Sequence, residues 1–153
     1  MRGKRVVQIL GAAAAAPLLV LATTTAALAD GDTHWIHQKS GKCLEAAFDG
    51  NGTPNGVQVY SCPSGDRAWH DVDNGDGTWL EQANYGSGYC LTADGGTPYL
   101  ASCSGGDNQR WYENGVGNGG YNLKNKATQT CLDSNGSSVY MLDCNGGQYQ
   151  IWR

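Results

Sequence analysis

The chain has 153 residues, and its 14 acidic and 10 basic side chains give a formal net charge of −4. This balance disfavours nucleic acid and anionic membranes as partners, because both attract basic surfaces. Glycine is abundant, at 23 residues, and no apolar stretch beyond the N-terminal segment has helical spacing. The composition therefore predicts an all-β fold of short strands joined by tight turns.

The N-terminal segment has the features of a secretory signal peptide. Basic residues at positions 2, 4 and 5 precede an apolar run that ends in Ala27-Leu28-Ala29. We therefore expect residues 1–29 to be cleaved and the protein to be secreted and extracellular. An uncleaved membrane anchor is the alternative, although Pro17 and polar residues interrupt the run. Cleavage would leave residues 30–153, enough for one domain, with a net charge of −7 and no membrane insertion.

The rest of the chain repeats itself three times. Each copy has a Cys-Leu pair, then a second cysteine and then a tryptophan, and the tryptophans are 42 and 41 residues apart. The copies extend over about 33–73, 77–115 and 119–153. A unit of this size cannot bury its apolar face alone, so we expect three copies to share one core. A propeller typically needs at least four blades, so a closed three-fold barrel is favoured.

Within each copy the residues predict the same order of elements. A first strand leads through a turn to the Cys-Leu pair, and a polar loop, a second strand, the second cysteine and the tryptophan follow. The first strands are expected at Trp35-Ile36, Trp79-Leu80 and Tyr121-Asn122-Leu123. Between the copies, Asn74-Gly75-Asp76-Gly77 and Asn118-Gly119-Gly120 predict hairpins, because Asn and Gly tolerate the positive φ of tight turns.

All six cysteines follow the predicted signal peptide, in a compartment where disulfides persist. Six cysteines allow 15 pairings, and the repeat register selects one disulfide for each repeat. The predicted pairs are Cys43–Cys62, Cys90–Cys103 and Cys131–Cys144. Closing a loop of this size stabilises a fold by roughly 3 kcal/mol in the chain-entropy estimate. No Cys-x-x-Cys pair is present, so we expect no metal ligation by these cysteines.

Three features together resemble the ricin B-type lectin family: Cys-Leu-(Asp/Glu), a second cysteine 13 to 19 residues later, and a Gln-x-Trp signature. The signature is Gln109-Arg110-Trp111 in the second repeat and Gln150-Ile151-Trp152 in the third, whereas Arg67-Ala68-Trp69 departs from it. The resemblance spans Trp35 to Arg153. It implies a β-trefoil of three pseudo-symmetric repeats, with up to three shallow pockets for glycans or polysaccharide.

The third repeat resembles that of actinohivin-type lectins, small secreted β-trefoils that bind high-mannose glycans. The matching stretches are Leu132-Asp133-Ser134-Asn135, Val139-Tyr140-Met141-Leu142 and Asn145-Gly146-Gly147-Gln148-Tyr149-Gln150-Ile151-Trp152. The resemblance makes a carbohydrate-binding set of Asp133, Tyr140, Leu142, Asn145 and Tyr149. These residue types suit a sugar, because its hydroxyls need polar partners and its C–H faces need apolar surface. A turn role for Asp133 and core positions for the tyrosines are the alternatives.

The first repeat resembles the ricin and xylan-binding variant of the family instead. It predicts a second, weaker carbohydrate site of Glu45, Gln58, Tyr60 and Asp66, in which Tyr60 is a stacking platform. Solvated surface is the alternative for Glu45. The second repeat has Thr92 at the carboxylate position and Ala101 at the aromatic one, so we expect it to have no strong site.

The sequence supports no metal site, cofactor or catalytic centre. The stretch from Asp71 to Gln82 resembles a calcium loop only superficially and predicts a polar hairpin. We expect His34, His37 and His70 on the surface, because they lack a zinc motif. No nucleophile elbow or free catalytic cysteine stands out, which favours a protein that is not an enzyme. The glutamines and tryptophans of the signature are expected in the core.

The sequence thus predicts a secreted, monomeric lectin that binds glycans without catalysis. Its best site is expected in the third repeat, with mannose-type glycans as the first candidate ligand. An extracellular protein-interaction or inhibitor trefoil without sugar binding is the alternative, because fold does not fix function. Excess soluble sugar discriminates between them, since it releases a lectin from its target and not a protein binder.

Overall fold

The structure is a computed structural model that describes residues 30–62, 69–83 and 87–153. The predicted signal peptide and Asp66 lie outside these residues. Strands dominate, and the only helical elements of the described part are two three-residue 3-10 turns, η1 (Asp107–Gln109) and η2 (Gln148–Gln150). The described residues contain no helix with the length and apolar character needed to cross a membrane. The all-β prediction is confirmed.

The described strands are short and pair in antiparallel fashion throughout. In chain order they are β1 (Gly31–Thr33), β2 (Cys43–Phe48), β3 (Pro54–Tyr60), β4 (Trp69–Asp73), β5 (Trp79–Ala83), β6 (Tyr89–Thr92), β7 (Tyr99–Ser102), β8 (Arg110–Gly117), β9 (Gly120–Asn125), β10 (Cys131–Ser134) and β11 (Val139–Leu142).

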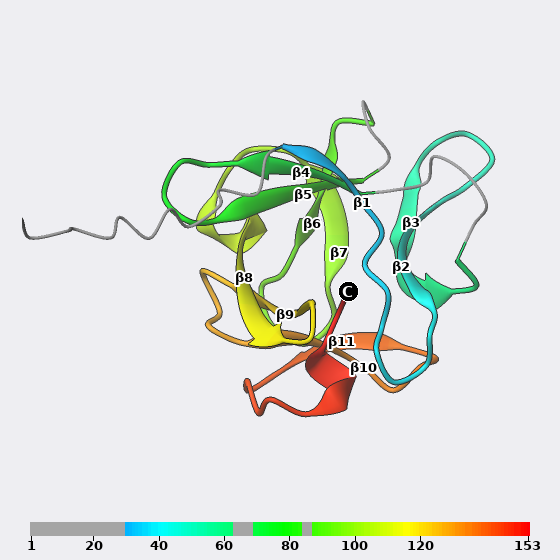
Figure 1. The fold of residues 1–153 in the computed structure, drawn as a ribbon. Coiled ribbons are helices and arrows are strands. Elements are labelled where there is room, and N and C mark those ends of the chain that lie inside the picture. Colours follow the sequence, from blue (N-terminus) through cyan, green and yellow to red (C-terminus); the bar gives the residue numbers. More distant parts are fainter. Residues whose placement is uncertain (1–29, 63–68, 84–86) are drawn as a thin grey trace, which may run out of the picture.

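Each repeat contributes one hairpin that lies off the central barrel: β2–β3, β6–β7 and β10–β11. Figure 1 shows them in cyan, green and orange around the strands of the barrel. The barrel strands β4, β5, β8 and β9 pair in series. Trp152 forms antiparallel β-bridges with both Tyr121 and His37, and these close the barrel. Three hairpins on one closed barrel make the β-trefoil that the repeats and the resemblance predicted.

The two predicted hairpins between the copies are also present. Asn118 and Gly119 have φ values of 51° and 72°, between the paired residues Gly117 and Gly120. Two consecutive residues with positive φ form the primed turn that matches the twist of a hairpin. The stretch from Asp71 onward forms the β4–β5 hairpin, with Asp73 paired to Trp79. The polar hairpin that we preferred there over a calcium loop is therefore confirmed.

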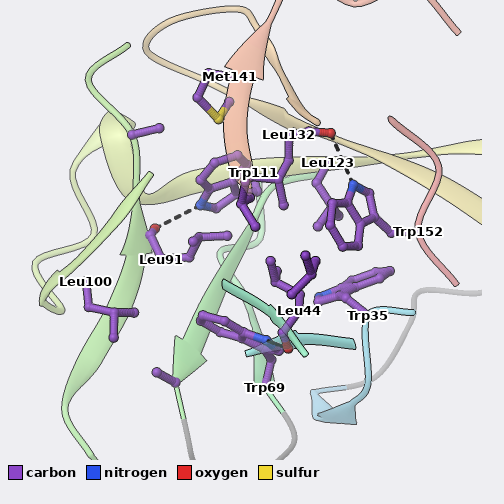
Figure 2. Close-up of a cluster of buried hydrophobic side chains, with 14 residues drawn as sticks. Trp35, Leu44, Trp69, Leu91, Leu100, Trp111, Leu123, Leu132, Met141 and Trp152 are labelled. Atoms are coloured by element: carbon purple, nitrogen blue, oxygen red, sulfur yellow. Dashed lines mark hydrogen bonds between the residues drawn. The ribbon is translucent and has the colours of Figure 1, made fainter. Parts of the chain in front are cut away.

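The core is built from the same residues in each repeat (Figure 2). The tryptophan that ends each repeat is almost fully buried and packs on the leucine of the Cys-Leu pair. Each indole Nε1 also donates a hydrogen bond to the backbone carbonyl of that leucine. The three bonds are Trp69 to Leu44 at 2.9 Å, Trp111 to Leu91 at 2.9 Å and Trp152 to Leu132 at 3.1 Å.

The disulfides form as the repeat register predicted, Cys43–Cys62, Cys90–Cys103 and Cys131–Cys144. Each one joins the first strand of a hairpin to the segment that follows the second strand. The hairpins are thereby held at their base, next to the buried leucine. This arrangement suits a domain whose core consists of few large side chains.

Replacing Trp111 by Phe tests the indole–carbonyl bond. We expect the free energy of unfolding to fall by about 2–4 kcal/mol, because the buried Leu91 carbonyl loses its donor and the smaller ring leaves a gap. Tyr112→Phe is the matched control on the same strand and should change stability by less than about 0.5 kcal/mol. Urea denaturation measures both, and equal losses in the two variants would show that the indole bond is not important.

Candidate carbohydrate-binding site

The third-repeat hairpin places its predicted side chains by the alternation of a β-strand. Asp133 of β10 is paired in register with Tyr140 of β11. Val139 and Met141 are buried in the core, so Tyr140 and Leu142 point to the opposite, outer face. Leu142 is 47% exposed, whereas Asp133 is only 3% exposed.

Asp133, Tyr140 and Tyr149 come together, and we call them the third-repeat site. Partial burial raises the pKa of Tyr140, as do hydrogen bonding to Asp133 and the charges of Asp133 and Tyr149. Tyr149 lies in η2 and is 47% exposed. The Lys39 ammonium lies 6.0 Å from the centre of its ring. A buried carboxylate thus lies beside two tyrosines that solvent can reach.

The other two predicted residues of this repeat line a depression at the base of the same hairpin. Leu142 and Asn145 line an open depression of about 400 Å³, together with Thr130 and Asp143. Asp133 and the two tyrosines do not line it. The side-chain oxygen of Asn145 accepts a hydrogen bond from the Gly147 backbone N–H at 2.7 Å. Its amide nitrogen has no hydrogen-bond partner among the described residues.

His37 supports the third-repeat site from the core. This corrects the expectation that it is a surface histidine. It is fully buried and lies against Trp152, with 5.0 Å between ring centres. Its Nε2 is 3.2 Å from the Tyr149 carbonyl and its Nδ1 is 2.8 Å from the Ser40 hydroxyl. A carbonyl can only accept, so Nε2 carries the proton and Nδ1 accepts from Ser40. His37 thereby fixes the backbone that carries Tyr149.

The second repeat contains the same kind of support. Trp111 pairs with Asn125 as Trp152 pairs with His37, so Asn125 and His37 occupy equivalent positions. Asn125 donates its amide to the Asn108 carbonyl at 2.9 Å, and Asn108 stands where the third repeat has Tyr149. A side chain from the next barrel strand therefore holds the backbone just before the buried glutamine in both repeats.

The second repeat also contains a polar cluster that the sequence analysis missed. The Tyr99 hydroxyl donates to one oxygen of Asp94, and the Asn108 amide donates to the other at 3.1 Å. The hydrogen bond to Asp94 is the main cause that raises the pKa of Tyr99. We call Asp94, Tyr99 and Asn108 the second-repeat site. The sequence did contain a signal for this site. Tyr99 follows Cys90 by nine residues, which is the same spacing as that of Tyr140 after Cys131.

The first-repeat residues lie on the outer face of the β2–β3 hairpin. Glu45 and Gln58 are directly opposite each other in the register. Tyr60 is 62% exposed, so its ring is open to a ligand. These three side chains make no hydrogen bond with another described residue. Asp66, the fourth predicted member, lies outside the described part.

Gln109 and Gln150 are buried, as expected from the sequence. The Gln109 side chain accepts from the Ser104 backbone N–H at 2.7 Å and donates to the Ser102 carbonyl at 3.0 Å. Gln150 makes the equivalent bonds to Asn145 and Asp143, at 2.9 and 3.0 Å. These glutamines connect the hairpin to the 3-10 turn and are not exposed to a ligand.

A closed β-barrel with three outer hairpins, two of which carry a carboxylate beside a tyrosine, has the architecture of a carbohydrate-binding β-trefoil. Comparison with known families agrees, because the model for the ricin-type β-trefoil lectin domain matches residues 32–152. The chain therefore belongs to the ricin-type β-trefoil lectin domain family, a family of carbohydrate-binding domains. Comparison with curated proteins finds no significant match.

Solved structures of the same fold include designed and natural proteins. ThreeFoil, a designed 3-fold symmetric protein, is 34% identical with a TM-score of 0.68, over 81% of this chain and 97% of that chain. SeviL, solved bound to the asialo-GM1 saccharide, is 16% identical with a TM-score of 0.67, over 81% and 95%. The exo-β-1,3-galactanase 1,3Gal43A from Clostridium thermocellum is 23% identical with a TM-score of 0.66, over 79% of this chain and 29% of that chain.

The burial of His37 predicts a pH dependence of stability. Burial lowers the pKa of His37 below its ordinary value of 6.5, against the opposing effects of the Tyr149 carbonyl and the Asp133 charge. Unfolding then takes up a proton, so the contribution of His37 is present above pH 6.5 and is lost as the pH falls below it. Urea denaturation between pH 5 and pH 8 measures this slope.

His37→Asn should flatten this part of the profile, because Asn does not titrate and Asn125 already makes the same contact in the second repeat. His34→Asn, at an exposed histidine, is the control and should keep the wild-type slope. Apart from His34, the other titrating groups are common to all three proteins, so a slope lost only in His37→Asn isolates His37. An unchanged slope in His37→Asn would contradict the assignment.

Proposed function

We propose that this protein is a secreted lectin that binds glycans without catalysis, chiefly through the third-repeat site. The observation that carries the proposal is the buried Asp133 carboxylate beside the hydroxyl of Tyr140, on the outer face of a rigid hairpin. A carboxylate accepts hydroxyl protons of a sugar in charge-assisted hydrogen bonds. Its fixed position is what distinguishes a binding carboxylate from a solvated one.

The surrounding residues support the recognition of more than one sugar unit. Tyr149 offers an exposed ring to the C–H face of a sugar bound at Asp133. The depression at Leu142 and Asn145 lies further along the same hairpin and would accept the neighbouring unit. An oligosaccharide should therefore bind more tightly than a monosaccharide. Mannose-type glycans remain the first candidate, on the resemblance of the third repeat to actinohivin-type lectins.

The second-repeat site is proposed as an additional glycan contact. Asp94 and Asn108 are hydrogen-bonded to each other, and Tyr99 joins them on the surface. The first-repeat set of Glu45, Gln58 and Tyr60 stays a weaker candidate, because it lacks such mutual bonds among the described residues. Two or three weak sites on one rigid domain raise the avidity for multivalent glycans.

The open form of the site favours binding over catalysis. Leu142 and Asn145 border a depression that is open to solvent, and an enzyme that cleaves glycosides must enclose the scissile bond. Family membership supports the same view. Cleavage of the predicted signal peptide and an extracellular location complete the proposal, and mass determination of the exported protein would test them.

Asp133→Asn is the decisive variant for glycan binding. It keeps the shape of the side chain and removes the charge, so retention of a bound oligosaccharide should fall about ten-fold or more. The measurement is binding to a glycan array with high-mannose, galactose-terminated and xylan-type ligands, followed by titration of the best ligand. Asp73→Asn, at an exposed carboxylate of the β4–β5 hairpin, should bind as the wild type does.

Asp94→Asn separates the contributions of the two sites. If both sites bind, this variant should lose avidity for a multivalent glycan but little affinity for a single oligosaccharide. If Asp133→Asn still retains the glycan and Asp94→Asn does not, the main site is in the second repeat. If the wild type binds no glycan on the array, or if excess soluble sugar does not release it from its target, the lectin proposal is overturned. A protein-interaction domain is then favoured.

A further inference from the structure

Three carboxylates from three different barrel strands meet, one of them buried in the barrel and two partly buried. Asp71 of β4, Glu81 of β5 and Glu113 of β8 each place one oxygen within 4.8 Å of the others. Asp71 and Glu81 are paired in register. None of the three belongs to the candidate sugar sites. We call them the carboxylate trio.

The trio breaks the three-fold pattern of the barrel. Trp69 pairs with Ala83, Trp111 with Asn125 and Trp152 with His37, so the residues two positions before these partners are equivalent. Those residues are Glu81, Leu123 and Trp35. All three are buried, and two are apolar. A carboxylate therefore replaces a core side chain in one repeat only, where a leucine or a tryptophan would stabilise the barrel better.

The trio lacks the partners that buried charges require. Glu81 is fully buried, and its Oε2 accepts from the Trp35 indole at 2.8 Å. Among the described residues no donor side chain or backbone N–H faces its Oε1, nor one buried oxygen each of Asp71 and Glu113. Only a proton held by Glu81 would join it to Asp71 and Glu113. Burial is the largest cause that raises the pKa of all three carboxyls. Isolated carboxylates are costly to bury, and a cation removes this cost.

We propose that the carboxylate trio binds a divalent cation, with Ca²⁺ as the best fit. All the available ligands are oxygens, which suit hard cations. The three oxygens lie within 4.8 Å of one another, so an ion about 2.3–2.6 Å from its ligands can contact all three after small side-chain adjustments, which the flexible coordination of Ca²⁺ tolerates. Mg²⁺ demands near-ideal octahedral geometry at about 2.1 Å, so it suits such a site less well.

A cavity gives such an ion access and room for water. It has a volume of about 260 Å³ and is lined by Asp71 and Glu113, with Asp32 and Thr33 on the adjoining strand β1. Ca²⁺ takes six to eight oxygen ligands, so waters in this cavity would complete the coordination. Arg153 is the one basic residue that lines the cavity, and it makes no ion pair with the trio among the described residues.

Terbium luminescence tests the proposal, because Tb³⁺ substitutes for Ca²⁺ and is excited by a nearby indole. The Trp35 indole is hydrogen-bonded to Glu81, so excitation of tryptophan should sensitise the emission of bound Tb³⁺. The disulfide-bonded wild-type protein should show this emission, excess Ca²⁺ should quench it, and millimolar Ca²⁺ should raise the Tm by several degrees.

Glu81→Gln keeps the acceptor for Trp35 and removes one charge, so it should lose the emission and the Tm shift. Glu113→Gln is the second variant, in case the first does not fold, and near-UV circular dichroism checks both folds. Asp107→Asn, at an exposed carboxylate, should respond as the wild type does. Emission retained in Glu81→Gln and Glu113→Gln would place the ion elsewhere. A wild type without emission or Tm shift would show that the trio holds only protons, whatever its glycan binding.

Discussion

The hydrogen bond from each repeat's tryptophan indole to a leucine carbonyl holds this small domain together. The tryptophan belongs to the barrel and the leucine to the hairpin, so one buried contact fixes the angle between the two. Because both groups are buried, either one left alone would cost far more than the bond itself contributes. The disulfide next to the leucine holds the same hairpin at its base. Each outer face is therefore rigid before any ligand arrives.

The three hairpins have nearly identical backbones, so their outer side chains can differ without loss of the fold. Function follows from those differences. The third hairpin carries Asp133 opposite Tyr140, and the second carries Thr92 opposite Tyr99. The second repeat then obtains its carboxylate from Asp94, two residues further along. The same polar chemistry is thus reached from different backbone positions. Symmetry of the fold does not require symmetry of the residues that bind.

The sequence predicted what short patterns determine. Cysteine register, the turn residues and the Trp spacing were enough for the disulfides, both inter-repeat hairpins and the barrel. The sequence could not predict contacts that arise only when the barrel closes. His37 reaches the Tyr149 carbonyl across 112 positions, and its isolated pattern indicated surface. The carboxylate trio was missed for the same reason, because its three members come from three different strands.

One short segment connects the interior of the barrel to the third-repeat site. Trp35 donates to Glu81 of the trio, and two residues later His37 supports Tyr149. The backbone of Ile36 between them is bonded in both directions to Arg153, at 2.6 and 2.9 Å. The equivalent segment of the second-repeat site runs from Leu123 to Asn125, and it adjoins the trio as well, because Leu123 is paired in register with Glu113. A cation at the trio would therefore stiffen the segments that support both the third-repeat and the second-repeat sites.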